Sequence, residues 1–274
     1  MDNNSLHSIR FIPRVAMLVF LVGCSGVQHP AIQTELKACP QQTAEGLAAE
    51  QNQLSFLTAS HTLVCAINTL QKSHDSAIQR TALGSRLCLT LAEREPNQDK
   101  REKFAAEGVR FAEIALEQGG QGDGAVHYYL AANLGLKVRD HIVLAMGSLD
   151  RLENEMKQAV ALSPDIDDGG PLRLLGALYL KAPAWPKGVG DLDKALELLK
   201  QAVDKYPNHP LNHLFYAQAL WEEGDQTSLS QAKAEFALGE KLLAEGDWGY
   251  NKQPWGTEFN EFAQEHAEIA SSIK

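Results

Sequence analysis

Apolar residues recur with helical spacing along most of the chain after residue 41. Over 54–67, for example, they fall about every three or four positions, on one face of a helix. No window alternates apolar and polar residues for long enough to predict a strand, so we expect an all-α fold. The segments 182–190 and 246–256 are expected to be irregular. The expected helices lie within 41–67 and over 77–93, 98–117, 125–136, 141–162, 171–181, 191–205, 210–223, 229–244 and 257–273.

The first residues have the features of a secretory signal. Residues 1–14 are polar and carry Arg10 and Arg14, and residues 15–22 are continuously apolar. This run is too short to cross ~30 Å of hydrocarbon, so it predicts a cleaved signal rather than a membrane span. The tetrad 21–24, Leu-Val-Gly-Cys, resembles the lipobox of bacterial lipoproteins.

The lipobox resemblance implies a lipid anchor. It implies that the chain is cut before Cys24 and that the thiol of Cys24 is acylated. Ser25 follows instead of an aspartate, which, by resemblance to the sorting rule of enteric bacteria, favours the outer membrane, facing the periplasm. We therefore expect a signal peptide over 1–23, a tether over 24–40 and a helical repeat domain over 41–274.

Three further cysteines, Cys39, Cys65 and Cys88, would lie in an oxidising compartment where disulfides form. An odd number leaves at least one of them unpaired in a monomer. Cys65 and Cys88 lie in successive predicted helices, so a bridge between them would staple a helical hairpin. The alternative is that both are small buried apolar side chains. No spacing of cysteine and histidine indicates a metal site.

Two segments with the same ending indicate an internal repeat. Residues 158–164 read Gln-Ala-Val-Ala-Leu-Ser-Pro, and residues 201–207 read Gln-Ala-Val-Asp-Lys-Tyr-Pro. Gly176 lies where a small residue would let two antiparallel helices approach closely. These features resemble the tetratricopeptide repeat, which implies helical hairpins stacked in a right-handed superhelix. We expect three hairpins within 98–244, and an atypical cap or divergent hairpin over 43–93.

A narrower resemblance rests on the segments 128–135, 167–176, 181–186 and 188–191. They resemble the TatT-type lipoproteins, the T-components associated with periplasmic TRAP transporters. The resemblance implies a helical protein that docks a periplasmic binding protein and holds a small ligand in an apolar pore or pocket. The alternative is an outer-membrane scaffold that assembles other envelope proteins and binds no small molecule. A second copy of the chain is a further candidate partner.

Several aromatic and polar residues are candidates for a ligand- or partner-binding surface. Tyr128 and Asn133 lie on the inner helix of a predicted hairpin. Because Tyr128 and Tyr129 are adjacent, one of them is expected to face away from the core. Tyr179 and Trp221 have helical spacing, which places them either in the core or in a pocket.

Two more candidates flank the irregular segment 182–190. Arg173 either binds a carboxylate ligand or locks this loop through an ion pair. Its possible ion-pair partners are Asp167, Asp168 and Asp191. Trp185 stands between two prolines, where it either contacts a partner or folds back onto the stack.

Charge and motif spacing exclude several classes of function. Asp and Glu number 35 against 25 Lys and Arg, a net charge of -10, so an acidic surface would repel nucleic acid. A calcium loop starting at Asp165 would need a glutamate where Gly176 stands. Pro210 places His209 outside the helix of His213, which argues against zinc. No catalytic or phosphate-binding motif is present, so we expect a non-enzymatic protein without a cofactor.

Overall fold

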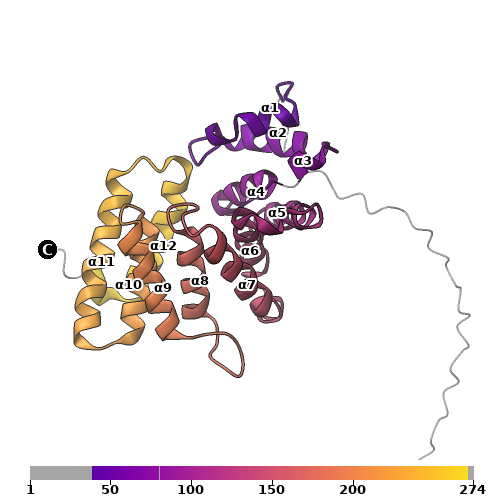
Figure 1. The fold of residues 1–274 in the computed structure, drawn as a ribbon. Helices are drawn as coiled ribbons and strands as arrows, with labels where there is room; N and C mark the ends of the chain where they lie inside the picture. Colours follow the sequence, from indigo (N-terminus) through magenta and orange to yellow (C-terminus); the bar gives the residue numbers. More distant parts are fainter. Residues whose placement is uncertain (1–38, 80, 271–274) are drawn as a thin grey trace, which may run out of the picture. The chain divides into compact units, whose positions relative to one another are not determined.

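The computed structural model describes residues 39–79 and 81–270, and its regular elements are helical (Figure 1). In these ranges the only β-pairing is an isolated bridge between Ala184 and Gly190. The predicted signal peptide, Cys24 and nearly all of the tether lie outside the described residues. The 3₁₀ helices are η1 (Gln51–Gln53), η2 (Gly120–Gly122) and η3 (Gly249–Asn251). The α-helices are α1 (Ala44–Ala49), α2 (Ser60–Gln71), α3 (Ser76–Gln79), α4 (Leu83–Arg94), α5 (Gln98–Glu117), α6 (Gly124–Val138), α7 (Ile142–Leu162), α8 (Gly170–Lys181), α9 (Leu192–Lys205), α10 (Pro210–Glu223), α11 (Gln226–Glu245), α12 (Lys252–Glu265) and α13 (Ala267–Ala270).

Consecutive helices pack as hairpins, in the order α4–α5, α6–α7, α8–α9 and α10–α11. Asn97, Asp191 and Asp225 start the second helices α5, α9 and α11, because their side chains accept hydrogen bonds from free backbone N–H groups. Gly176 allows α8 to approach α9 closely, since an added Cβ would lie 2.6 Å from Cγ of Leu199. The predicted all-α fold of stacked tetratricopeptide-like hairpins is confirmed.

The connections between hairpins lie along one edge of the stack, and the connections within hairpins lie along the other. At the first edge, Gly124 lies against Ser163, where an added Cβ would stand 2.7 Å from the serine hydroxyl. Because short connections make neighbouring helices antiparallel, the connections 139–141 and 182–191 share the opposite edge. The loop between α8 and α9 protrudes there beyond the helix ends, at the bottom of Figure 1.

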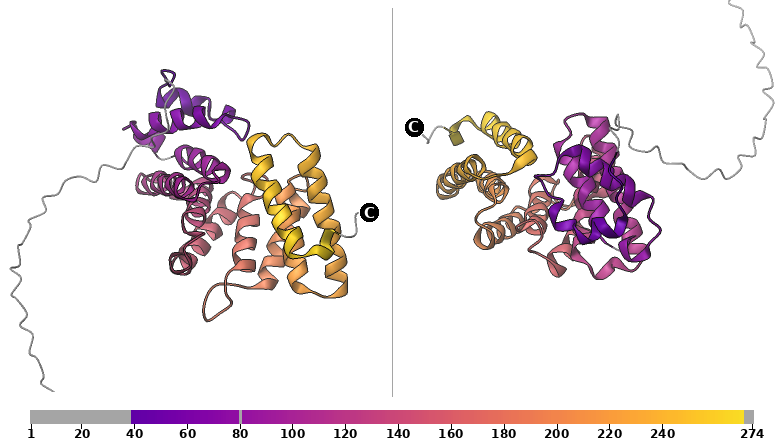
Figure 2. Two further views of the ribbon diagram at one scale, coloured as in Figure 1. Left: turned by 180° about the vertical axis from the view of Figure 1, so that it is seen from behind. Right: turned by 90° about the horizontal axis from the view of Figure 1, so that it is seen from above.

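The first helices form a core of their own. Leu63, Ile67 and Leu87 lie at its centre, and both views of Figure 2 show α1 to α3, in indigo, beside α4 and α5. A second core extends from α4, through Leu89, to α13 and contains Leu130 and Phe236. Across 39–79 and 81–270, no helix is both long enough and apolar enough to cross a membrane.

The segment after η1 contacts the segment before α12. The backbone N–H of Tyr250 donates to the backbone oxygen of Phe56 at 3.1 Å. Arg94 donates from Nη1 to the backbone oxygen of Thr58 at 2.7 Å, and its guanidinium lies 4.9 Å from the centre of the Tyr250 ring. Arg94 therefore ties α4 to chain segments on both sides of it.

Two predicted helices differ most in their boundaries from the observed ones. The expected helix 77–93 is divided into α3 and α4, and the hydroxyl of Thr81 accepts from the N–H of Leu83 at 3.4 Å where the second helix starts. The expected helix 257–273 begins earlier, as α12, because Pro254 fits the first turn, where a helix needs no N–H donor. It also ends earlier, and α13 follows.

The disulfide joins Cys39 to Cys65, and Cys88 is free and buried. The hypothesis of a bridge between Cys65 and Cys88 is therefore wrong, because the segment before α1 brings Cys39 to Cys65 on α2. Burial raises the pKa of the Cys88 thiol well above its usual value. A ring nitrogen of His61 lies within 4.8 Å of both bridged sulphurs, but sulphurs bonded to each other offer no thiolate ligand to a metal.

Candidate functional site

Asn133, a predicted binding residue on α6, is fully buried and joins α6 to α4. Its Nδ2 donates hydrogen bonds to the backbone oxygen of Ser85 at 2.9 Å and to that of Tyr129 at 2.8 Å. Gly108 on α5 leaves room for the side chain, because an added Cβ would stand 2.3 Å from Oδ1 of Asn133. The position of Asn133 therefore serves helix packing and leaves it out of reach of a ligand.

Tyr128 and Tyr129 are both buried, 3% and 4% exposed, so the expectation that one faces away from the core is wrong. The reason is that α6 is covered by neighbours on more than one side, including α4, α5 and α7. The Tyr129 hydroxyl donates to Oδ1 of Asp167 at 3.1 Å. Burial, and then the negative charge of Asp167, raise the pKa of both tyrosines well above the usual value.

Arg173 holds the turn between α7 and α8. Asp167 and Asp168 adopt left-handed backbone angles there, with φ of 48° and 50°, which are unfavourable for residues that carry a Cβ. The buried guanidinium donates to their backbone oxygens at 3.4 Å and to Oδ1 of Asn212 on α10 at 2.6 Å. Arg173 thus donates to the backbone of two of its three predicted partners, Asp167 and Asp168. The third, Asp191, caps α9 instead.

The pKa of Glu93, near the end of α4, is shifted by the charges of Asp167 and Arg173. Enclosure by the surrounding protein and the negative charge of Asp167 raise the pKa of Glu93 to about 7, although the positive charge of Arg173 opposes this. Glu93 is nevertheless solvent-exposed, so water screens the charges that act on its carboxyl group. Burial also raises the pKa of Asp167, again against the charge of Arg173. Two carboxyl groups therefore share one cation.

A pocket of about 430 Å³ lies between α8, α10 and α12 and is strongly acidic. The buried Oε1 of Gln218 in its wall has no hydrogen-bond partner among the described residues. The charge of Glu258 in the wall also contributes to the raised pKa of Glu93, so these two groups are electrostatically coupled. Four glutamates against one lysine favour a cationic occupant. The pocket is lined by Leu180, Lys181, Gln218, Glu222, Glu258, Glu261, Phe262, Glu265 and His266.

The structure brings Trp221 next to this pocket and leaves Tyr179 away from it. The Trp221 ring lies 5.2 Å from the ring of His266 and 6.4 Å from that of Phe262, both pocket residues. Tyr179 is buried, and its hydroxyl donates to Oε1 of Glu153 on α7 at 2.7 Å. Tyr179 thus joins α8 to α7.

Trp185 is 86% exposed in the loop 182–190, so the alternative that it folds back onto the stack is wrong. The loop is ordered by the bridge between Ala184 and Gly190 and by the hydrogen bond from the Gly190 N–H to the Pro183 oxygen at 2.9 Å. The predicted candidates therefore do not form a single site.

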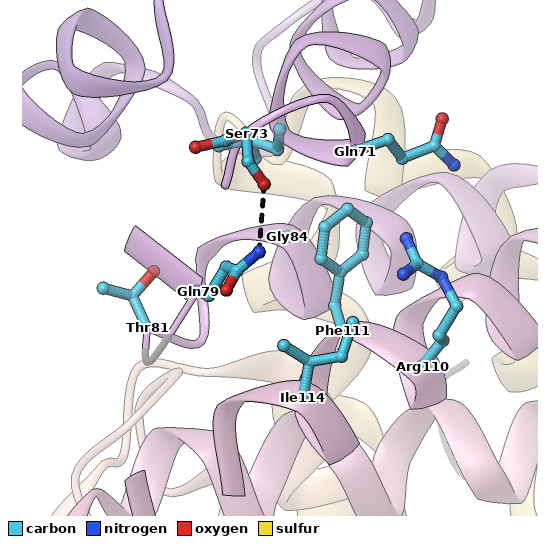
Figure 3. A pocket seen from close by; sticks show the side chains of 9 residues that line it. Gln71, Ser73, Gln79, Thr81, Gly84, Arg110, Phe111 and Ile114 are labelled. Carbon is cyan, nitrogen blue, oxygen red and sulfur yellow. Dashed lines mark hydrogen bonds between the residues drawn. The ribbon is translucent and has the colours of Figure 1, made fainter. Parts of the chain in front are cut away.

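A second pocket, beside α5, is too small for a ligand (Figure 3). Its volume of about 30 Å³ leaves room for one or two water molecules. Nε2 of Gln79 donates to the backbone oxygen of Ser73 at 3.0 Å. The Phe111 ring and the Ile114 side chain lie opposite. We interpret this pocket as a packing gap.

One histidine arrangement recurs in two hairpins. In each, a histidine on the first helix contacts a glutamate on the second helix and a backbone oxygen six residues earlier in the chain. This recurrence is structural evidence of a repeated unit. The groups are His127 with Glu155 at 2.6 Å and Gln121 at 3.0 Å, and His213 with Glu235 at 2.7 Å and Pro207 at 2.7 Å.

Comparison with family models supports the repeat. Residues 188–241, from the end of the protruding loop to α11, match the model of the tetratricopeptide repeat family. The chain contains a tetratricopeptide-type repeat. A search of curated proteins found no match to the chain. The tetratricopeptide repeat generally mediates binding between proteins, so a protein partner is indicated in general.

The acidic residues of the pocket were missed, although three of them lie within the expected helix 257–273. A signal was available, since Glu258, Glu261 and Glu265 are spaced three and four positions apart and so share one helix face. Glu93 had no comparable signal, because its environment comes from residues far away in sequence.

The burial of His209 predicts that the stability of the fold depends on pH. Its ring is buried between Trp248 and Trp255, with ring centres 5.6 and 5.0 Å away, and Nδ1 has no partner among the described residues. Burial, and then the charge of Arg173, lower the pKa of His209 to about 2. Below pH 6.5 the unfolded chain binds a proton that the folded chain does not, so stability should fall on acidification.

We expect His209 to remove about 2 kcal/mol from the free energy of unfolding between pH 6.5 and 5. His213 acts in the opposite sense, because Glu235 and Pro207 outweigh its burial and raise its pKa. Urea unfolding of the wild-type protein and of His209→Phe at both pH values measures the contribution of His209. The variant should lose less stability on acidification. The exposed His74→Phe is the control, and an equal pH slope in wild type and His209→Phe would contradict the prediction.

Proposed function

We propose that the chain is a non-catalytic, lipid-anchored interaction protein of the outer membrane that docks a periplasmic binding protein in TRAP-type transport. Acylated Cys24 would hold it at the membrane, and the hairpins would present the docking surface. The acidic pocket between α8, α10 and α12 carries this proposal, as the site for a basic side chain of the partner or a small cationic ligand.

Size and charge support this role for the pocket. Its volume of about 430 Å³ lies within the ~300–1,000 Å³ of pockets that enclose ligands. Lys181 is its one lysine, and its Nζ lies 5.1 Å from the centre of the Phe215 ring. This cation–π contact directs the lysine charge toward an aromatic face, so it neutralises the four glutamates only in part.

The segments that resemble TatT-type lipoproteins support the link to transport. Residues 167–176 include the turn that Arg173 holds, and residues 181–186 and 188–191 build most of the protruding loop. Both are ordered features beside α8, which also lines the acidic pocket. A partner seated at the pocket would therefore be close to segments in which the resemblance is concentrated.

Site-specific photo-crosslinking in cells tests the docking surface. A photoreactive phenylalanine analogue replaces Glu261 in the pocket or, as a control, the half-buried Glu113 on α5. We expect position 261 alone to crosslink a TRAP-type periplasmic binding protein, and Glu222→Gln/Glu265→Gln to weaken the crosslink. An envelope assembly protein captured instead would favour the scaffold alternative, and no crosslink from position 261 would contradict the docking site.

Membrane fractionation tests the anchor separately. The wild-type protein should remain with outer membranes after a high-salt wash, and Cys24→Ala should abolish acylation and this retention. Mass spectrometry of the mature N-terminus reports acylation directly, so an unmodified thiol in a membrane-retained protein would contradict the lipid anchor.

A further inference from the structure

Three consecutive apolar side chains at the start of α7 project into solvent. Ile142 is 81% exposed, Val143 is 84% exposed and Leu144 is 57% exposed. Trp185, in the loop between α8 and α9, is 86% exposed. Single exposed apolar residues are ordinary on protein surfaces, whereas a group of large ones marks a surface that meets an apolar partner.

These four residues belong to one edge of the stack, the edge of the connections within hairpins. The loop that carries Trp185 packs against α7, because an added Cβ on Gly188 would stand 3.0 Å from Cδ1 of Leu149. Leu149 lies about two helical turns beyond Ile142 on the same helix. We name Ile142, Val143, Leu144 and Trp185 the apolar edge.

Cations flank the apolar edge, although the chain as a whole is acidic. Lys137 and Arg139 precede α7, Lys187 follows Trp185, and all three are exposed. Asp140, in the same connection, is paired with the largely buried Arg101 and also lies 3.8 Å from Nε of Arg139. The edge thus combines exposed apolar side chains with exposed cations, a combination that suits anionic phospholipid headgroups.

The geometry favours lipid over a protein surface as the occupant. Consecutive helical residues point about 100° apart, so Ile142, Val143 and Leu144 spread around much of the helix. A single protein face would contact only part of this spread, whereas lipid surrounds it. Tryptophan prefers the interface between water and hydrocarbon, and Trp185 protrudes there with Lys187 beside it.

We propose that the apolar edge inserts into the interfacial region of a phospholipid bilayer and forms a second membrane contact. The proposal rests on the proposed lipid anchor only for bringing the chain to the membrane. Residues 25–38 between the anchor and Cys39 can span at most roughly 50 Å, which is enough to bring an edge of a domain of this size to the bilayer. Insertion would fix the orientation of the hairpins and hence of the acidic pocket.

Fluorescence quenching in vesicles tests the insertion. The acylated full chain is reconstituted into vesicles of phosphatidylethanolamine and phosphatidylglycerol that carry bromine on their acyl chains, which quenches only tryptophan in contact with lipid. We expect quenching that disappears in Trp185→Phe, which assigns it to that residue. Ile142→Ser/Val143→Ser should also abolish it while Trp185 remains, and Leu238→Ser, an exposed site on α11, should leave it unchanged.

Other outcomes overturn the proposal. Equal quenching in wild type and Trp185→Phe would show that Trp185 stays in water. A change of oligomeric state in Ile142→Ser/Val143→Ser without a change in quenching would assign the edge to a second copy of the chain. Flotation of the unacylated Cys24→Ala chain with the same vesicles separates this proposal from the anchor, because the double serine change should weaken that binding about tenfold or more.

Discussion

Replacing Arg173 with methionine should lower the free energy of unfolding by about 3–5 kcal/mol. Methionine keeps much of the length and apolar volume of the arginine stem but carries no charge and no donor. Arg173 is 5% exposed, and its guanidinium donates to Asn212 and to the backbone oxygens of Asp167 and Asp168. Its removal would take the donor from the buried Oδ1 of Asn212, which is costlier than losing an exposed hydrogen bond, and would weaken the part-buried bonds to the backbone of Asp167 and Asp168.

Electrostatics adds to this cost. The positive charge of Arg173 opposes the raised pKa values of both Glu93 and Asp167. In Arg173→Met the two carboxyl groups would lose their shared cation, so the pKa of Glu93 should rise above about 7. The left-handed turn at Asp167 and Asp168 would also lose the side chain that holds it.

Urea unfolding at neutral pH measures the effect, with Arg151→Met as a matched control. Arg151 pairs with Glu113 at 2.8 Å, but both side chains are 43% exposed, so this change should cost less than about 1 kcal/mol. Equal stability losses in the two variants would contradict the assigned role of Arg173. Arg173→Lys should recover only part of the loss, because a lysine cannot reproduce the fork of donors.

The hairpins could be predicted because their signals are local. Asp191 caps the start of α9, and Pro207 prevents its continuation, so the sequence alone places both ends. The match over 188–241 covers the same part of the chain. Where a short turn interrupts an otherwise helical pattern, as between α3 and α4, the pattern by itself predicts one helix where there are two.

The site could not be predicted in the same way, because helices far apart in sequence build it. The raised pKa of Glu93 depends on charges at Asp167 and Glu258, which no local pattern connects to α4. Asn133 is a polar residue of the kind that lines binding sites, yet Gly108 on the neighbouring α5 makes room for its side chain to be buried. Which side chains meet is therefore decided by packing between hairpins.

Removing the disulfide should cost about 3.5 kcal/mol of unfolding free energy, the second large effect we expect. Cys39 and Cys65 are separated by 26 residues, and their bond restricts the unfolded chain over the whole of this loop. The loop contains α1, whose six residues are too few to form a stable helix alone. The bond therefore holds α1 against α2 and the core around Leu63 and Ile67.

The double variant Cys39→Ser/Cys65→Ser tests this without leaving an unpaired thiol at the site. Urea unfolding should show the loss under non-reducing conditions, and a reducing agent should destabilise the wild-type protein but not the variant. Because the N-terminal helices have a core of their own, amide exchange should accelerate at Leu63 and Ile67 while Leu214 stays protected. Equal destabilisation of both proteins by the reductant would contradict this origin, since Cys88 is already free and buried in each.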